Sequence, residues 1–306
     1  MDILRNEILR WMEDYKQTSV RSTTYDRLIT SLNLMEKYPI SSMRTDQIQT
    51  NDIQRYINKL SDDGYALSTI KKQLHLIGEY IDHATIVGDL TRPVHKAVKL
   101  PSEEAVKKHK KEVIAYTKAE QRALKAVLTK HDNPAYYTIL IMLETGMRIG
   151  EALALSWDDI DWNRKAVRVR KTVVRIAEKK RSYVQNSAKS FSSNRVIPLS
   201  KDAQNILSWM KTTDNCLSSF IFHDEHGERL SYEALRWWTQ KACNEAGIEY
   251  YGQHVFRHTF ATNCYEKGCD VKMLSKLLGH ADVTITYNVY IHLFGDALEE
   301  MRAVVD

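Results

Sequence analysis

The stretch His254-Val-Phe-Arg257-His258-Thr-Phe-Ala-Thr carries the strongest signal in this chain. His254, Arg257 and His258 stand at positions i, i+3 and i+4, so a helix would place them on one side. Imidazole and guanidinium groups both donate hydrogen bonds to phosphate oxygens. A His-x-x-Arg motif alone is common in proteins. Here it is followed directly by His-Thr-Phe-Ala-Thr, and the longer motif is much more specific. We therefore expect His254 and Arg257 to bind phosphate, and His258 to pack and hydrogen-bond inside the protein.

Four other segments lie around this stretch. Two precede it, Thr145-Gly-Met-Arg148-Ile-Gly-Glu151 and Ala188-Lys189-Ser-Phe-Ser-Ser-Asn-Arg-Val-Ile-Pro-Leu199, and two follow, Leu277-Leu-Gly-His280 and Thr286-Tyr-Asn-Val-Tyr290-Ile-His292. Arg148 precedes a helical run, where backbone amides can join it around a phosphate. Gly279 can end a helix with a positive φ and present the His280 imidazole beside it.

Together these five segments resemble the tyrosine recombinase family, which includes phage and transposon integrases. The resemblance is weak before residue 110 and specific across residues 143–292. It implies six catalytic residues: Arg148, Lys189, His254, Arg257, His280 and the nucleophile Tyr290. It also implies supporting roles for Glu151, which would orient Arg148 or the His254 region, and for His258. Ser190 and Phe191 depart from the threonine and lysine that usually follow the family's lysine.

These residue types suit attack on a phosphodiester. The transition state spreads negative charge over the non-bridging oxygens, and the planar guanidinium groups of Arg148 and Arg257 match that geometry. A phenol of pKa about 10 needs a proton acceptor and positive surroundings before it attacks well. His254 and His280 can accept that proton or donate to phosphate. Lys189 is the candidate acid, because an ammonium can protonate the leaving 5′ oxygen and a guanidinium cannot readily do so.

Two of these assignments have rivals nearby. Tyr287 lies three residues before Tyr290, and the resemblance favours Tyr290 because it is followed by x-His about ten positions after the Leu-Gly-His motif. Lys189 competes with other lysines that we expect to be solvated strand or turn residues, namely Lys171, Lys179 and Lys180.

Composition narrows the class of protein. The hydrophobic fraction of 43% and charged fraction of 27% are those of a soluble globular chain, and no run of 18 apolar residues predicts a membrane span. The polar start excludes a signal peptide, so we expect a cytoplasmic, nucleoid-associated protein. The cysteines have neither zinc-site nor disulfide-scaffold spacing and should be reduced. With no Gly-rich phosphate loop and no metal-ligand spacing, we expect no cofactor, no metal ion and no need for ATP.

The net charge of +5 weakly favours a polyanionic partner. The basic run Lys107-Lys-His-Lys-Lys111 is either a solvated linker or a strap along phosphates. We predict a mainly α, two-domain chain: an N-terminal helical core-binding bundle over residues 1–98, a basic linker over 99–114, and a C-terminal catalytic domain over 115–306. The resemblance implies that the catalytic domain is mixed α/β with a small antiparallel sheet and ends in an exchange tail.

Local patterns support this division. Apolar stripes at helical spacing mark the bundle, among them Ile53, Tyr56, Ile57 and Leu60, and Ser68 should cap the helix that follows. Thr117-Lys-Ala-Glu120 has the form of a capping box. Val167, Val169, Lys171 and Val173 alternate with polar residues and predict one strand, with shorter strands at Tyr183-Val184 and Arg195–Leu199.

The resemblance implies how such a protein works. The two domains would clamp duplex DNA at core-type sites, and Tyr290 would form a covalent 3′-phosphotyrosyl link during integration or excision of a mobile element. A helix expected within a few residues of Met1 leaves no room for an additional arm-binding domain. The apolar residues after Tyr290 would dock on a neighbouring protomer in a homo-tetramer on two duplexes, with accessory DNA-bending or excision factors as further partners and no membrane.

Two alternatives come from other classes of protein. A type IB topoisomerase would relax DNA by the same chemistry without joining two duplexes, and the compact motifs argue against it. A non-catalytic DNA-binding relative would be expected to have lost one of the six residues, and all six are present.

Overall fold

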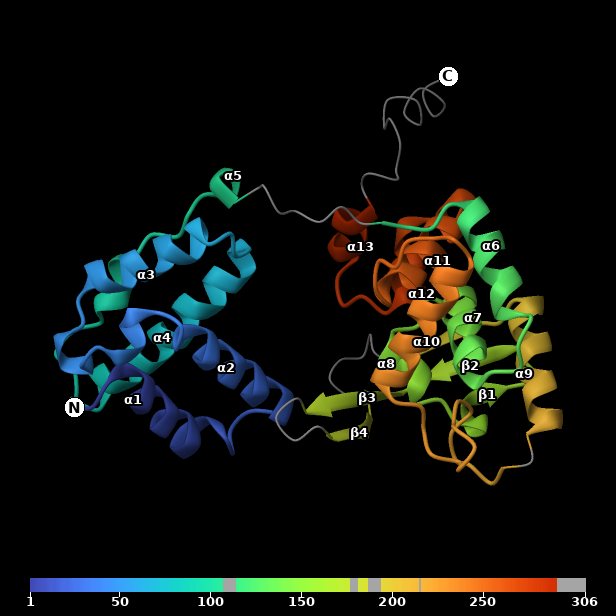
Figure 1. Cartoon of the computed structure of the whole chain (residues 1–306), viewed down its shortest axis with the longest axis horizontal. Helices are drawn as coiled ribbons and strands as arrows, with labels where there is room; N and C mark the ends of the chain where they lie inside the picture. The colour runs from blue at the N-terminus through green and yellow to red at the C-terminus, as the bar shows by residue number, and fades with distance from the viewer. Residues whose placement is uncertain (107–113, 177–180, 187–193, 215, 291–306) are drawn as a thin grey trace, which may run out of the picture. The chain divides into compact units, whose positions relative to one another are not determined.

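The structure, a computed structural model, describes residues 1–106, 114–176, 181–186, 194–214 and 216–290 (Figure 1). The chain forms two compact units, residues 1–112 with 175–181 and residues 113–174 with 182–306, and each has its own apolar core. The mainly helical fold with small antiparallel sheets confirms the predicted fold class. The domain boundaries stay a prediction. Among the described residues, none of the helices combines the length and hydropathy that a membrane span requires.

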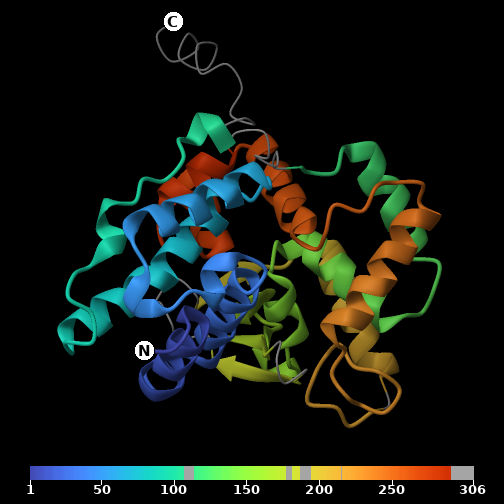
Figure 2. The same cartoon turned by 60° about the vertical axis from the view of Figure 1, so that its left-hand side comes forward.

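The first unit is built from amphipathic helices, blue to cyan in Figures 1 and 2. These are α1 (Leu4–Trp11), α2 (Ser22–Met35), α3 (Thr50–Asp62), α4 (Leu67–Ile86) and α5 (Glu103–Val106), with a π-helical turn at Met12–Lys16 and 3-10 turns at Pro39–Ser42, Thr45–Gln47 and Val94–Ala97. The stripe predicted on α3 is fully buried. The predicted cap at Ser68 is wrong, because α4 begins one residue earlier and its N-cap residue is Ala66, which makes no side-chain cap bond.

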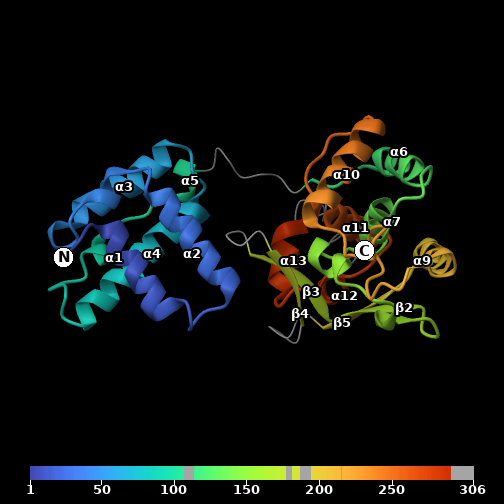
Figure 3. The same cartoon turned by 60° about the horizontal axis from the view of Figure 1, so that its bottom comes forward.

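The second unit packs most of its helices around α7. Its elements are α6 (Lys118–Leu128), α7 (Pro134–Thr145), α8 (Ile149–Leu153), a 3-10 turn at Trp157–Asp159, α9 (Lys201–Thr213), α10 (Tyr232–Glu245), α11 (His254–Glu266), α12 (Val271–Leu278) and α13 (Val283–Tyr290). The buried α7 contacts α6, α8, α9, α10 and α11 (Figures 1 and 3). Thr117 and Glu120 form the predicted capping box at the start of α6.

The strands form two small sheets rather than one continuous ladder. β1 (Ile160–Asp161), β2 (Ala166–Val169) and β5 (Arg195–Pro198) form a three-stranded sheet in the order β1-β2-β5, and β3 (Lys171–Ile176) pairs with β4 (Arg181–Asn186). The single strand predicted through Val167 and Val173 is therefore wrong, since the chain changes sheets at Arg170. There Arg170 and Lys171 both turn to the buried carboxylate of Asp159, a partner that the alternating pattern does not reveal.

Two glycines end helices where the chain must turn sharply. Gly146 follows α7 with φ of +63°, and a side chain there would collide with the ring of Phe260. Gly279 follows α12 with φ of +66°, as its place in Leu-Leu-Gly-His280 predicted. Left-handed backbone of this kind strains any residue with a Cβ. Both turns lead directly into residues that the sequence marks as candidates, Arg148 and His280.

Candidate active site

Arg148 stands at the start of α8 and is held by Glu151, one helical turn later. The Glu151 carboxylate accepts hydrogen bonds from the Arg148 backbone N–H at 2.8 Å and from its guanidinium Nη1 at 2.9 Å. The Arg148 side chain remains 38% exposed whereas that of Glu151 is 6% exposed. Glu151 therefore fixes the orientation of Arg148, and the exposed part of the Arg148 side chain can contact a ligand.

Arg257 is the more deeply buried of the two candidate arginines. It lies on α11 with 4% of its surface exposed. Nη1 donates to the Gly146 carbonyl at 3.0 Å and Nη2 donates to the Leu278 carbonyl at 2.6 Å. Each terminal nitrogen of a guanidinium carries two N–H groups, and each of these two contacts uses one of them. The carbonyls fix the plane of the group between the ends of α7 and α12.

The C-terminal end of α12 receives three guanidinium groups on three consecutive carbonyls. Arg195 Nε donates to Leu277 at 2.7 Å, Arg257 to Leu278, and Arg148 Nη2 to Gly279 at 3.4 Å. The last carbonyls of a helix have no partner within the helix and carry partial negative charge. One helix end thus gathers arginines from a strand, from α11 and from the start of α8.

Arg195 is a member of this cluster that the sequence reasoning missed. It begins β5, is 5% exposed, and makes a two-pronged ion pair with Glu151, Nη1 to Oε1 at 3.0 Å and Nη2 to Oε2 at 2.7 Å. A signal was available, because strand alternation places Arg195 on the same face as the buried Ile197. Burial alone would raise the pKa of the Glu151 carboxyl, but Arg195 and then Arg148 lower it to about 2.

The candidate histidines are kept neutral by their surroundings. Desolvation by the surrounding protein, then Arg257 and Arg148, lower the pKa of His254, although solvent still reaches its side chain. His258 and His280 are more enclosed, and burial together with the neighbouring positive groups lowers the pKa of each to about 4. A bound anion would raise the pKa values of the three imidazoles again, because its negative charge would offset the positive charge of the arginines.

His280 has a defined partner for one ring nitrogen. Its Nδ1 lies 2.7 Å from the hydroxyl oxygen of Thr286, a fully buried residue on α13. The sequence analysis assigned no role to Thr286. Its position one helical turn before Tyr290 could have indicated a contact near the nucleophile.

Tyr290 is the last residue of α13, and its side chain is outside the described part of the structure. Its rival Tyr287 lies on the same helix and is 49% exposed. Lys189, with Lys179 and Lys180, falls outside the described residues. Lys171 is described, and its ammonium contacts Ser156 and Asp159, which marks it as a structural residue. The structure therefore brings together Arg148, Glu151, His254, Arg257, His258 and His280.

Within the described ranges, His, Cys, Asp and Glu side chains form no group of three or more with the geometry to hold a metal ion. The four cysteines are free thiols. The acid nearest the candidate arginines, Glu151, is already engaged by Arg148 and Arg195. The hydrogen-bond donors of this site are guanidinium and imidazole groups, which are suited to bind an anion.

Comparison with protein families matches residues 115–296 to the phage integrase family. Among similar proteins, a XerC-like tyrosine recombinase of Caldanaerobacter subterraneus subsp. tengcongensis is 27% identical over 282 residues, covering 85% of this chain and 71% of the relative. The integrase of Staphylococcus phage L54a is 25% identical, over 92% of this chain and 86% of its own length. The transposase from transposon Tn916 of Enterococcus faecalis is 24% identical over 95% and 75%.

Solved structures share the fold. The Tn1549 transposon integrase, in complex with a circular intermediate DNA, superposes with a TM-score of 0.78 at 18% identity and covers 99% of this chain and 100% of its own. A lambda integrase tetramer bound to a Holliday junction superposes with a TM-score of 0.66 at 17% identity, over 94% of this chain and 76% of its own.

Proposed function

Because this chain belongs to the phage integrase family and is a tyrosine recombinase, we propose that it cuts and rejoins duplex DNA at specific sites through a covalent link between Tyr290 and a 3′ phosphate. The phenol oxygen attacks phosphorus, the bond to the 5′ oxygen breaks, and Lys189 supplies the proton that this oxygen takes. The freed 5′ hydroxyl of a partner strand then reverses the reaction. The phosphotyrosine conserves the bond energy, and the product is a recombined duplex of a mobile element and its target.

The cationic cluster at the end of α12 is the observation that carries this proposal. Three guanidinium groups meet there, and the carboxylate of Glu151 balances only one of their charges. Burial, and then the neighbouring positive groups, lower the pKa values of His258 and His280. A phosphodiester in its transition state carries the negative charge that such a site lacks.

Each candidate then has a role that matches its contacts. Arg148 and Arg257 hold the non-bridging oxygens, Arg148 oriented by Glu151 and Arg257 by its two carbonyl partners. His254 and His280 donate further hydrogen bonds, and His254, whose pKa is lowered and whose side chain is exposed, receives the phenol proton. Glu151 orients Arg148 without touching the DNA, and His258 lies half-buried on α11 beside His254 and Arg257.

A nicked suicide duplex tests the nucleophile, since it traps the covalent intermediate by losing the attacking 5′ end. Tyr290→Phe should abolish the adduct and leave DNA binding intact, while Tyr287→Phe should retain it. The reverse pattern would transfer the nucleophile to Tyr287. Strand exchange on paired sites separates recombination from the relaxation that a type IB topoisomerase would give.

A bridging phosphorothiolate tests the acid. Lys189→Ala should slow cleavage of a normal duplex by about 10²–10⁴-fold. It should cleave a duplex with sulfur at the 5′ bridging position at nearly the rate of the unchanged protein, because a thiolate leaves without a proton. Equal slowing on both substrates would remove Lys189 from this role, and Lys171→Ala is the matched control.

The first unit offers a basic groove for the same DNA. A groove of about 520 Å³ runs along α2 and α4 and includes Arg27, Lys37 and Lys72 together with the uncharged side chains of Asn33 and Thr69. Cations that neutralise phosphates supply most sequence-independent affinity, and amide and hydroxyl groups add hydrogen bonds. We assign this groove to contacts with the sugar-phosphate backbone of the DNA at the core site.

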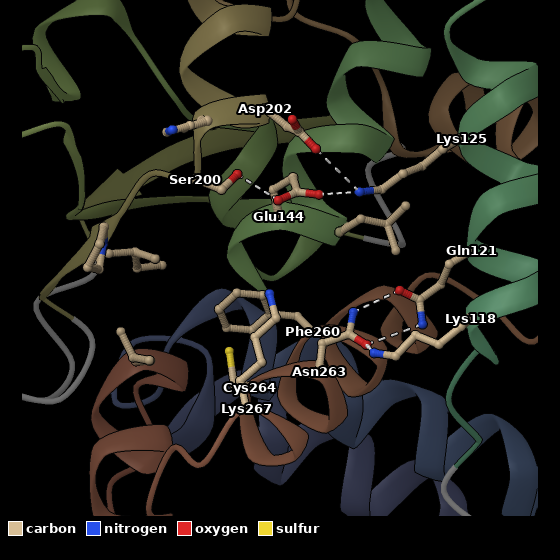
Figure 4. A pocket seen from close by; sticks show the side chains of 15 residues that line it. Lys118, Gln121, Lys125, Glu144, Ser200, Asp202, Phe260, Asn263, Cys264 and Lys267 are labelled. Carbon is tan, nitrogen blue, oxygen red and sulfur yellow. Dashed lines mark hydrogen bonds and ion pairs between the residues drawn. The ribbon is translucent and has the colours of Figure 1, made fainter.

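Assembly requires a docking place for residues 291–306, whose apolar positions are too few to form a core of their own. The second unit has a pocket of about 600 Å³ between α6, α7, α9 and α11 (Figure 4). Apolar side chains within it are Leu143, Ile197, Pro198, Phe260 and Leu277, and its lysines are Lys118, Lys125, Lys201 and Lys267. In Figure 4, Lys125 reaches Glu144 and Asp202, and Lys118 reaches Asn263.

This pocket complements the segment after Tyr290 in polarity and in charge. The segment pairs Leu293, Phe294, Leu298 and Met301 with the acids Asp296, Glu299, Glu300 and Asp306. We assign the pocket to this segment of a second copy within a tetramer on two duplexes. Leu277 belongs both to the pocket and to the carbonyls that bind the arginines, so docking would be felt at the phosphate site.

A charge exchange tests the assignment. Lys201→Glu with Lys267→Glu should lower formation of paired-site complexes in native gels while single-site binding persists, and Glu299→Lys with Glu300→Lys should restore them. Lys272→Glu, on the exposed side of α12, is the control. Truncation after Phe294 should also weaken paired-site complexes. Unchanged pairing by the truncated chain would place the segment on its own catalytic unit.

A further inference from the structure

The hydrogen bond between His280 and Thr286 joins the phosphate site to the helix that carries Tyr290. Nδ1 and the hydroxyl oxygen lie 2.7 Å apart, and Thr286 is fully buried. Thr286 and Tyr290 are both on α13, four residues or about one turn apart. A contact at one end of this turn therefore constrains the backbone at the other.

His280 carries a single proton at neutral pH. Burial lowers the pKa of its imidazole to about 4, together with the charges that face it, Arg257 and His258 on α11, Arg148 at the start of α8 and Arg195 on β5. A neutral imidazole has one nitrogen that donates and one that accepts, and the partner of the first nitrogen decides the state of the second. The partner of Nδ1 is Thr286.

The hydroxyl of Thr286 differs from those of other buried helical threonines. Thr145, Thr239 and Thr259 donate to the carbonyl four residues earlier, at 2.5, 2.7 and 2.8 Å. The described hydrogen bond of the Thr286 hydroxyl goes instead to the His280 ring. If this hydroxyl donates to Nδ1, the imidazole accepts there and its single hydrogen lies on Nε2.

We propose that Thr286 is a positioning residue that keeps the His280 proton on Nε2, so that the imidazole donates to the scissile phosphate instead of turning a lone pair toward it. The same bond holds the helix of Tyr290 against the phosphate site. The proposal rests on the phosphoryl-transfer function assigned above, and it adds a residue that does not touch the reacting atoms.

Nitrogen-15 spectra of histidine in the free protein test the tautomer without any DNA. His280 should appear as a fixed Nε2–H tautomer in the unchanged protein and in Thr286→Ser, which keeps the hydroxyl. Thr286→Val has the same shape but no hydroxyl, and it should lose the fixed tautomer. Thr284→Val, on the exposed face of the same helix, should leave it unchanged. An Nδ1–H tautomer in the unchanged protein, or an unaltered tautomer in Thr286→Val, would overturn the proposal.

Covalent capture on the suicide duplex gives the second readout. Thr286→Val should form the adduct about tenfold more slowly, the usual scale for one lost hydrogen bond in a site, and Thr286→Ser should recover most of the rate. A Thr286→Val protein that captures DNA at the unchanged rate contradicts the proposal. If the unchanged protein forms no adduct at all, the assigned function fails, while the tautomer measurement still decides the role of Thr286.

Discussion

The core of the first unit and the phosphate site of the second bury polar groups in different ways. In the first unit the buried pair is neutral, the Tyr56 hydroxyl donating to the Gln73 amide oxygen at 2.9 Å. In the second unit ions are buried, with Glu151 and Arg195 exposed by 6% and 5% and Arg257 by 4%. Each of these buried groups makes hydrogen bonds. In the second unit, three guanidinium groups gather around the one carboxylate of Glu151.

The difference indicates what each region is for. Removing an ion from water costs several kcal/mol, and an ion pair recovers this only with good geometry and further hydrogen bonds. The neutral Tyr56–Gln73 pair of the first unit avoids that cost. In the cluster at the end of α12, Arg148 and Arg195 share the carboxylate of Glu151 and Arg257 donates to two carbonyls. A bound phosphate would complete this arrangement.

The largest expected effect is on folding stability. Arg195→Met should lower the free energy of unfolding of the second unit by about 3–5 kcal/mol, because it leaves Glu151 as a buried carboxylate with one partner. Tyr56→Phe, the matched change in the first unit, should cost about 1 kcal/mol. Urea unfolding followed by hydrogen exchange in each unit measures both. Equal costs would remove the distinction between the two regions.

Between pH 7 and pH 5.5 the response to pH should be smaller, and it should also separate the units. Folded His258 and His280 have pKa values of about 4 against an ordinary 6.5, so the unfolded chain binds protons that the folded chain does not. Stability of the second unit should therefore fall as pH drops from about 6.5 toward 4. Glu151, with its pKa lowered from 4.5 to about 2, adds a further loss between those values.

Hydrogen exchange of α11 amides at pH 7 and pH 5.5, corrected for the intrinsic rate, measures this loss, with α3 as the reference. Burial also lowers the pKa of His95 in the first unit, so a small loss is expected there too. Inorganic phosphate should reduce the loss in α11, since a bound anion raises the histidine pKa values. A loss in α11 no greater than that in α3, or one that phosphate leaves unchanged, would contradict the cationic site.

The smallest effect concerns the basic groove of the first unit. Arg27→Ala and Lys72→Ala should each weaken DNA binding by up to about tenfold and reduce the slope of log affinity against log salt by about one. Lys59→Ala, whose ammonium pairs with Asp63 outside the groove, should change neither. Fluorescence anisotropy over a salt series gives both quantities, and unaltered slopes in the groove variants would move the DNA to another face.

Much of the site could be predicted because its residues sit in contiguous segments. The spacing of His254 and Arg257 predicted that both lie on one side of a helix, and they lie on the first turn of α11. Gly279 predicted the turn before His280. The strand prediction failed at Arg170 because alternation describes the two faces of a strand and says nothing of which neighbour it pairs with. Asp159, the residue that draws Arg170 and Lys171 aside, is ten or more positions away.

The amino-acid sequence alone determined the helical nature of both units, the family and the candidate residues, because helix periodicity, caps and motif spacing are properties of neighbouring positions. Only the tertiary structure decided that Arg195 shares Glu151 with Arg148, that Thr286 bonds His280, and that three arginines converge on one helix end. These contacts join residues 6 to 131 positions apart. Their energy depends on burial and on facing charges, which exist only once the chain has folded.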